Sequence, residues 1–242
     1  MRLLSLTILI LLTLLVNWAM AADKIIMVAS NAPLGAQDAL IKARLEGMGF
    51  EVEAHSHDEA QPVDISGAAA VFICESIGSG NIASAYKEAP IPVIICEAAV
   101  FDDMKFVIPT NLYSKNPDLS ILITDPSHPV AGGLSGEVKV VTGPGEILAC
   151  AGLQGDLQVV ATLNGDPCLM YYEKGAKVAD GSTTPARRAC TFLHNSAIPL
   201  LTEDGWGLIE RSVLWALGQI GVAVEPREAV TTTWGTLKTH YR

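Results

Sequence analysis

Three carboxylates follow an apolar run near the middle of the chain, and they are its clearest group of residues able to do chemistry. The run is Pro92–Cys96, and the carboxylates are Glu97, Asp102 and Asp103. Carboxylate oxygens bind hard cations such as divalent metal ions, and two carboxylates in different surroundings can divide acid and base roles. The alternative is a solvated acidic loop in which an aspartate caps the next segment. We expect any active site of this chain to lie here.

A cysteine and two histidines are further candidates for catalysis. Cys96 ends the apolar run and could attack a substrate only as a thiolate, which needs a nearby histidine or a helix N-terminus. His194 would provide this base, or act with Glu97, if its strand returns to the same edge of the sheet. His128 lies in a proline-flanked turn and could carry a proton or bind a ligand. The structural alternatives are a buried, inert thiol and histidines bonded within their own loops.

The elements that position these residues alternate between strands and helices in the first half of the chain. We predict strands over Lys24–Ala29, Phe50–Ala54, Ala68–Cys74 and Pro92–Cys96, a helix over Ala36–Met48 and a short helix ending at Tyr86. Apolar strands joined by helices and short loops indicate a parallel sheet that is covered on both faces. The pattern predicts an α/β fold with a flavodoxin-like, doubly wound and mostly parallel sheet.

Such a sheet binds ligands at the carboxyl ends of its strands, where the strand order reverses. The loops at that edge bring together polar residues that follow three different strands. We predict that the ligand is bound by Ser30, Asn31, Glu75, Ser76, Asp102 and Asp103, and by His128 from the second half. No cofactor is evident, and a divalent metal ion at the carboxylates stays open.

The second half of the chain adds strands separated by glycine- and proline-containing turns. We predict strands over Leu119–Thr124, Glu137–Thr142, Gln158–Leu163, Cys168–Glu173 and Arg188–His194. These turns indicate additional strands, including a hairpin, beside the parallel sheet. Thr202–Gly218 predicts an amphipathic helix whose N-cap is Thr202.

Both ends of the chain differ from its middle. Residues 1–21 are typical of a signal peptide, with a basic start, an apolar run and an Ala19-Met20-Ala21 cleavage site. An uncleaved membrane anchor is the alternative. Cleavage leaves one domain over residues 22–223 and a linker and tail over residues 224–242. We expect export to the periplasm or the cell exterior, without membrane insertion after cleavage.

Charge and cysteine spacing exclude several function classes. The formal net charge of −10 gives no electrostatic basis for binding nucleic acid. The five cysteines are widely spaced and form no C-x-x-C pair, so neither a disulfide scaffold nor a zinc ribbon is indicated. We expect buried free thiols. A bridge between Cys74 and Cys96, which end two predicted strands, stays an alternative.

Several short motifs of the second half occur in an informative order. They are Asp125–Val130 with Gly133-Leu134, Tyr172–Gly175, Phe192–His194 and the helix from Trp206 to Gly218. In this order they resemble the ThuA-like branch of the class I glutamine amidotransferase-like superfamily. The resemblance extends over roughly Lys24–Gly218 and implies a flavodoxin-like fold.

The chain departs from the catalytic pattern of that superfamily. Active glutaminases carry a nucleophilic cysteine on a tight, strained elbow after a strand like Pro92–Cys96. Here Glu97 stands at or next to that position, Cys96 lies one residue early, and the flanking glycines are absent. His194 also lacks the glutamate of the family's His-x-Glu pair. The resemblance therefore argues against glutamine hydrolysis.

These observations favour an exported, non-catalytic or vestigial amidotransferase-like domain. It would bind a small molecule, such as a carbohydrate, or a partner protein. The alternative is a hydrolase that uses Glu97 with His194 or His128, with or without a metal ion. That enzyme requires these groups to converge within hydrogen-bond reach. In a third alternative, the tail recruits the domain to an envelope assembly.

Overall fold

A nine-stranded mixed sheet forms the centre of the computed structural model, which describes residues 23–56, 63–108 and 112–221. The strand order is β2-β1-β3-β4-β11-β10-β9-β6-β7. The strands are β1 (Lys24–Ala29), β2 (Glu51–Ser56), β3 (Ala70–Ile73), β4 (Val93–Ile95), β6 (Ser120–Ile123), β7 (Gly136–Lys139), β9 (Gln158–Leu163), β10 (Asp166–Tyr172) and β11 (Arg188–Cys190). The predicted signal peptide and tail lie outside the described residues.

The sheet has a parallel part and an antiparallel part. Strands β2, β1, β3, β4 and β11 are parallel to one another. Their order on either side of β1 is that of a flavodoxin-like, doubly wound sheet. Strands β10, β9, β6 and β7 continue the sheet with antiparallel pairs. The predicted fold class is confirmed, including the additional strands of the second half.

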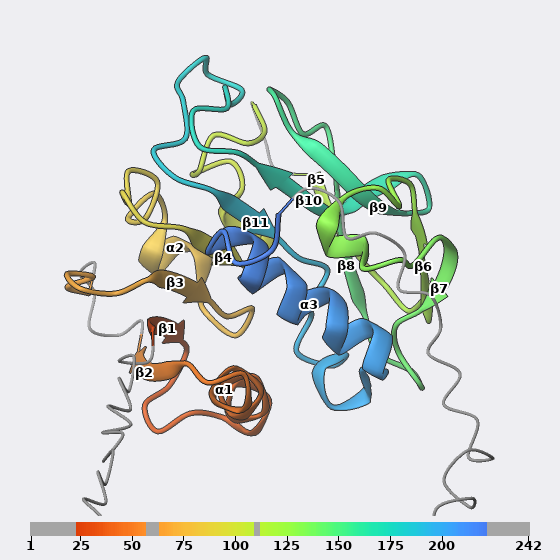
Figure 1. Cartoon of the computed structure of the whole chain (residues 1–242), viewed down its shortest axis with the longest axis horizontal. Coiled ribbons are helices and arrows are strands. Elements are labelled where there is room, and N and C mark those ends of the chain that lie inside the picture. Colours follow the sequence, from red (N-terminus) through yellow and green to blue (C-terminus); the bar gives the residue numbers. More distant parts are fainter. Residues whose placement is uncertain (1–22, 57–62, 109–111, 222–242) are drawn as a thin grey trace, which may run out of the picture.

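Helices cover both faces of the parallel part. Helices α1 (Ala36–Gly47) and α3 (Glu203–Ala216) belong to the same apolar layer as Ile25 and Met27 of β1. Helix α2 (Ser79–Ile82) and the 3-10 helix η2 (Ala98–Val100) pack with Ile26 and Val28 on the opposite face. Figure 1 shows α3 lying across the sheet and α1 next to β1 and β2. Alternate residues of one strand thus enter two separate cores.

A small second sheet, which the sequence pattern does not predict, lies beside the large one. Strands β5 (Leu112–Asn116) and β8 (Ile147–Ala151) pair antiparallel. Leu148 and Cys150 of β8 enter the apolar layer that contains η2. No residue of β5 is buried, so its sequence lacks the alternation that indicates a half-buried strand.

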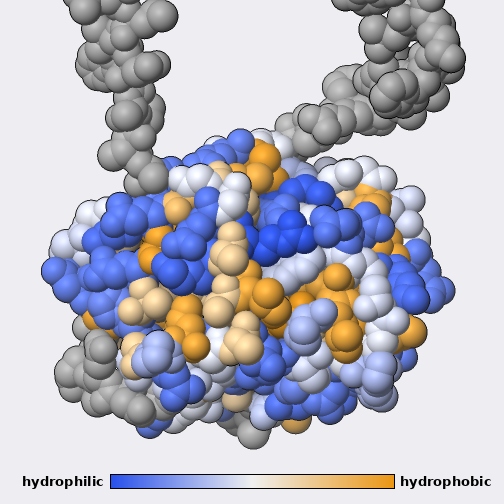
Figure 2. Space-filling view, turned by 90° about the horizontal axis from the view of Figure 1, so that it is seen from below, coloured by the Kyte–Doolittle hydropathy of each residue, from blue (hydrophilic) through white to orange (hydrophobic). Residues whose placement is uncertain are grey.

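The last helix begins where the sequence predicts. Thr202 is the N-cap of α3, and its hydroxyl accepts a hydrogen bond from the backbone N–H of Gly205 at 3.0 Å. Two acidic residues, Glu203 and Asp204, occupy the first turn, where the helix dipole favours negative charge. In the described part of the chain, no helix has the length and apolar character needed to cross a membrane. On the face shown in Figure 2, hydrophilic residues separate small apolar areas.

Strand direction decides which candidate residues can meet. Because β11 is parallel to β3 and β4, its carboxyl end lies at the same edge of the sheet as theirs. The residues following these strands therefore gather there, namely Glu75, Glu97 and His194. Strand β6 runs in the opposite direction, since three antiparallel pairs separate it from β11. His128, which follows β6, lies at the opposite edge.

Candidate functional site

Glu75 is the centre of a polar cluster at the carboxyl ends of the parallel strands. It follows β3 and is only 8% exposed. Its Oε1 lies 3.2 Å from His194 Nε2 and 3.5 Å from Lys115 Nζ. Its Oε2 accepts a hydrogen bond from the backbone N–H of Asn195 at 3.1 Å. A buried carboxylate needs such partners, so Glu75 holds the loop after β11 against the end of β3.

Lys115 and His194 meet directly, with 2.9 Å between Nζ and Nε2. An ammonium group can only donate, so Lys115 is the donor in this contact. The same Nε2 lies 3.2 Å from Glu75 Oε1. On the other side of the ring, Nδ1 lies 2.8 Å from Ser196 Oγ and 3.3 Å from Glu146 Oε2, and the backbone N–H of Ser196 donates to it at 3.3 Å. Charged and polar groups thus run from Glu146 through His194 and Lys115 to Glu75.

Glu97 is the second buried carboxyl group of this edge. It follows β4, is 9% exposed, and its Oε1 accepts a hydrogen bond from the backbone N–H of Ala99 at 2.7 Å. The pKa of Glu97 is raised to about 7, chiefly by burial and also by the charge of Glu75, while the hydrogen bond from Ala99 and the charge of Lys115 oppose the rise. Near neutral pH this carboxyl group is therefore divided between its two protonation states and can both give and take a proton.

The geometry around Cys96 does not favour a nucleophile. The thiol is fully buried, and Thr191 Oγ1 donates a hydrogen bond to its sulfur at 3.3 Å. Burial raises the pKa of Cys96 to about 12. Glu97 has φ −80° and ψ 98°, an ordinary extended conformation, and Cys96 is absent from the described non-glycine residues with positive φ. The strained elbow of a covalent nucleophile does not occur at either position.

Native protein treated with iodoacetamide at pH 8 is expected to keep all five thiols unmodified. All five cysteines are free and fully buried, and burial raises the pKa of each thiol, so almost no thiolate is available. Mass spectrometry would show no adduct in buffer and five adducts in urea. Rapid single modification of native protein at Cys96 would contradict this account.

Three other predicted residues form a separate polar group beside the cluster. The backbone N–H of Ser30 donates to Ser76 Oγ at 3.1 Å, and Asn31 Nδ2 donates to Ser30 Oγ at 2.8 Å. The Ser76 hydroxyl in turn donates to Asp38 Oδ2 at 2.8 Å. Asp38 is 2% exposed, and its burial raises its pKa. This group ties α1 to the loop after β3.

The remaining predicted residues do not join the cluster. Asp102 and Asp103 are half-buried, and Asp102 Oδ1 accepts a hydrogen bond from the backbone N–H of Asp103 at 3.0 Å. The ring of His128 stacks on Tyr171, with 4.9 Å between centroids, and its Nδ1 accepts a hydrogen bond from the backbone N–H of Val130. Burial lowers the pKa of His128. His128 therefore acts as the cap of a short 3-10 helix at the opposite edge.

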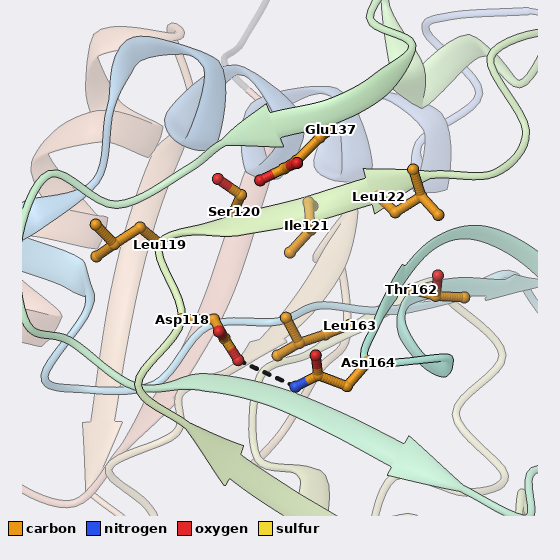
Figure 3. A pocket seen from close by; sticks show the side chains of 9 residues that line it. All are labelled: Asp118, Leu119, Ser120, Ile121, Leu122, Glu137, Thr162, Leu163 and Asn164. Carbon is orange, nitrogen blue, oxygen red and sulfur yellow. Dashed lines mark hydrogen bonds between the residues drawn. The ribbon is translucent and has the colours of Figure 1, made fainter.

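In the described part of the chain no metal site is found at the cluster, and a cavity lies away from it. In residues 23–56, 63–108 and 112–221, no group of three or more His, Cys, Asp or Glu side chains is arranged to hold a metal ion. A cavity of about 430 Å³ lies over β6, β7 and β9 instead. Figure 3 shows Leu122 and Glu137 lining it, with Asp118 bonded to Asn164 at 3.1 Å. The divalent-metal alternative thus rests on the sequence alone.

Sequence reasoning missed several residues of the cluster and of the polar group beside it. Lys115, Glu146, Ser196 and Asp38 were not among the predicted site residues. Lys115 is a single lysine in a polar stretch with no strand pattern, and only pairing with β8 brings it to this edge. Ser196 could have been noticed, because it follows His194 by two residues and short polar side chains often bond locally.

Comparison with known proteins gives only distant likenesses. No family model matches the sequence, and no curated protein matches it. The crystal structure of SMU.1228c is 11% identical, with a TM-score of 0.49, over 78% of this chain and 99% of that chain. A glutamine amidotransferase from Thermotoga maritima is 8% identical, with a TM-score of 0.48, over 81% of this chain and 98% of that chain. Because both TM-scores are below 0.5, we infer nothing about this chain from them, and the ThuA-like resemblance stays a prediction.

Proposed function

We propose that this protein is an exported, non-catalytic ligand-binding module of amidotransferase-like fold, which binds a small polar ligand at the carboxyl-edge cluster of Glu75, Glu97, Lys115 and His194. The observation that carries the proposal is the contrast between two neighbouring groups. The thiol of Cys96 is fully buried, whereas the side chain of Lys115 is 41% exposed above a buried Glu75. The edge thus presents groups for hydrogen bonding but no accessible thiol at Cys96.

The charges of the cluster favour a neutral or cationic ligand. Glu75 and Glu146 face one lysine and the ring of His194, and Glu97 adds a partial negative charge near neutral pH. An anionic ligand would meet this excess of carboxylates at close range, which is unfavourable in a partly buried site. Hydroxyl and amine groups, by contrast, can donate to the carboxylate oxygens.

A hydrolase is the second candidate, and the raised pKa of Glu97 is the observation that favours it. A carboxyl group that titrates near neutral pH is suited to general acid–base catalysis. Glu97 would take a proton from a water molecule, and the resulting hydroxide would attack the substrate while Lys115 stabilises the developing negative charge. The bond to the leaving group would then break as Glu97 returns the proton to that group. No bond between enzyme and substrate would form in this reaction.

Thermal melting of the mature chain against a ligand panel tests the proposal. The panel contains methyl glycosides, acyclic polyols, primary amines and divalent cations, each with and without a chelator. One class is expected to stabilise wild type, by about 2.7 kcal/mol at a hundredfold excess over its dissociation constant. For an uncharged probe the gain should vanish in Lys115→Met, which removes a hydrogen-bond donor, and persist in the matched control Lys139→Met, an exposed strand lysine outside the cluster.

The outcomes separate the two candidates. Stabilisation that persists in Lys115→Met, or no stabilisation by any probe, would contradict a small-ligand site at the cluster. Product formation from the stabilising probe, detected by proton NMR and abolished in Glu97→Gln, would establish the hydrolase instead. Binding without turnover supports the non-catalytic module.

A further inference from the structure

Tyr113 lies on the same face of β5 as Lys115. Side chains two residues apart in a strand point to the same side, and their Cα atoms are roughly 6.6 Å apart. In the antiparallel pair with β8, Tyr113 is opposite Cys150 and Lys115 is opposite Leu148. Directly opposed residues share a face, and both β8 residues enter the apolar layer that contains η2. This face of β5 therefore turns toward the segment that begins at Glu97.

The electrostatic contacts agree with this placement. The charge of Lys115 acts on Glu97, and the charges of Asp166 and Asp102 act on the Cys150 thiol opposite Tyr113. Lys115 and the residue opposite Tyr113 are thus both within electrostatic reach of carboxylates that follow β4. Leu112 occupies the other face of the strand, opposite Ala151.

The ring of Tyr113 is available for contact. The residue is 39% exposed, and in the described part of the chain no side-chain hydrogen bond, ring stacking or cation–π contact of Tyr113 is found. An aromatic ring on the same strand face as Lys115, whose amine lies 3.5 Å from Glu75, offers an apolar, electron-rich face near hydrogen-bonding groups.

We propose that Tyr113 is the stacking platform of the ligand site and that the ligand is a neutral pyranose sugar. This inference rests on the proposed function. A pyranose has an apolar C–H face, which an aromatic ring can cover, and a rim of hydroxyl groups. With the ring on Tyr113, hydroxyl groups at its rim donate to the carboxylates of Glu75 and Glu97 and accept from Lys115. An acyclic polyol has the same hydroxyl groups but no rigid face, so the site discriminates between them.

Titration calorimetry with four methyl glycosides (glucoside, galactoside, mannoside and N-acetylglucosaminide) and with sorbitol tests the inference. At least one glycoside is expected to bind the mature chain, and sorbitol should bind at least about tenfold more weakly. Tyr113→Ala should weaken glycoside binding by about tenfold, the loss of one aromatic contact. Tyr113→Phe should stay within about threefold of wild type, because it keeps the ring. Leu112→Ala, on the opposite face of the same strand, should leave the affinity unchanged.

Three results would overturn the inference. They are no binding of any glycoside, equal binding of glycoside and sorbitol, or undiminished glycoside binding by a Tyr113→Ala variant whose melting curve shows it to be folded. If sorbitol binds in a Lys115-dependent manner while no glycoside binds, the proposed ligand site stands and only the role of Tyr113 as a sugar platform is wrong. If no probe binds in a Lys115-dependent manner, both the proposed ligand site and the role of Tyr113 as a sugar platform are wrong.

Discussion

Arg188→Ala is expected to lower the free energy of unfolding by about 4 kcal/mol. Arg188 is 1% exposed and has no carboxylate partner among the ion pairs of the described residues. Its guanidinium instead donates to five backbone carbonyls, those of Lys87, Ala89, Ile91, Ala186 and Arg187. Its removal would leave several buried acceptors unsatisfied and a cavity, each costing about 1–3 kcal/mol.

Urea unfolding at pH 7 measures this loss. A matched control is Arg187→Ala, whose side chain is 27% exposed and pairs with Glu173 at 2.7 Å. Arg187 also donates to the backbone carbonyl of Trp215 at 2.6 Å and lies 4.6 Å from the centroid of its ring, so we expect this control to cost about 2 kcal/mol. Burial lowers the pKa of Arg188 only to about 10, so the residue stays charged at pH 7. A loss for Arg188→Ala no larger than that of the control would contradict its role in fastening the start of β11 to the start of β4.

Wild type is expected to lose about 3 kcal/mol more stability than Glu97→Gln between pH 5 and pH 9. The pKa of Glu97 is raised by burial from its ordinary value of 4.5 to about 7. Because the folded state holds this proton more tightly than the unfolded state, the contribution is fully present below pH 4.5. It falls as pH rises through 7, by about 1.4 kcal/mol for each pKa unit.

Comparing wild type with Glu97→Gln separates the contribution of the Glu97 carboxyl group from those of the other buried titratable groups. Burial also raises the pKa of Asp38 and lowers that of His128, and both remain in Glu97→Gln. Urea midpoints measured at half-unit steps from pH 5 to pH 9 would give the difference curve directly. Parallel curves for the two proteins would show that the carboxyl group of Glu97 is ionised throughout, and would remove the acid–base candidate.

The parallel half of the fold could be predicted because burial imposes a simple pattern. Lys24–Ala29 is apolar enough to lie inside a covered sheet, and β1 has the predicted bounds. Gln158–Leu163 likewise forms β9 as predicted. Strand β11, in contrast, ends at Cys190 rather than at His194. The four residues that follow form the loop that brings His194 to Glu75, so the error falls at the site itself.

The pairing of Glu75 with His194 could be expected in outline but not in detail. Both residues are polar and follow a predicted strand, which indicates that they lie at the same edge of the sheet. The parallel direction of β11 brings them together there. The partner Lys115 could not be predicted, because β5 is held by backbone pairing with β8 rather than by an apolar face. His128 is the opposite case. It lies in a clear sequence motif and was a predicted site residue, but the direction of β6 places it at the opposite edge of the sheet.

An NMR titration of the ¹⁵N-labelled mature chain tests the central claim most directly. The probe is the panel compound that raises the melting temperature most. If the carboxyl-edge cluster is the ligand site, amide shifts will concentrate at Glu75, Ala99, Lys115 and Asn195, and Lys115→Met will abolish them. Shifts concentrated at Ser120, Leu122 and Asn164 would instead place the ligand in the cavity over β6, β7 and β9, and would contradict the account.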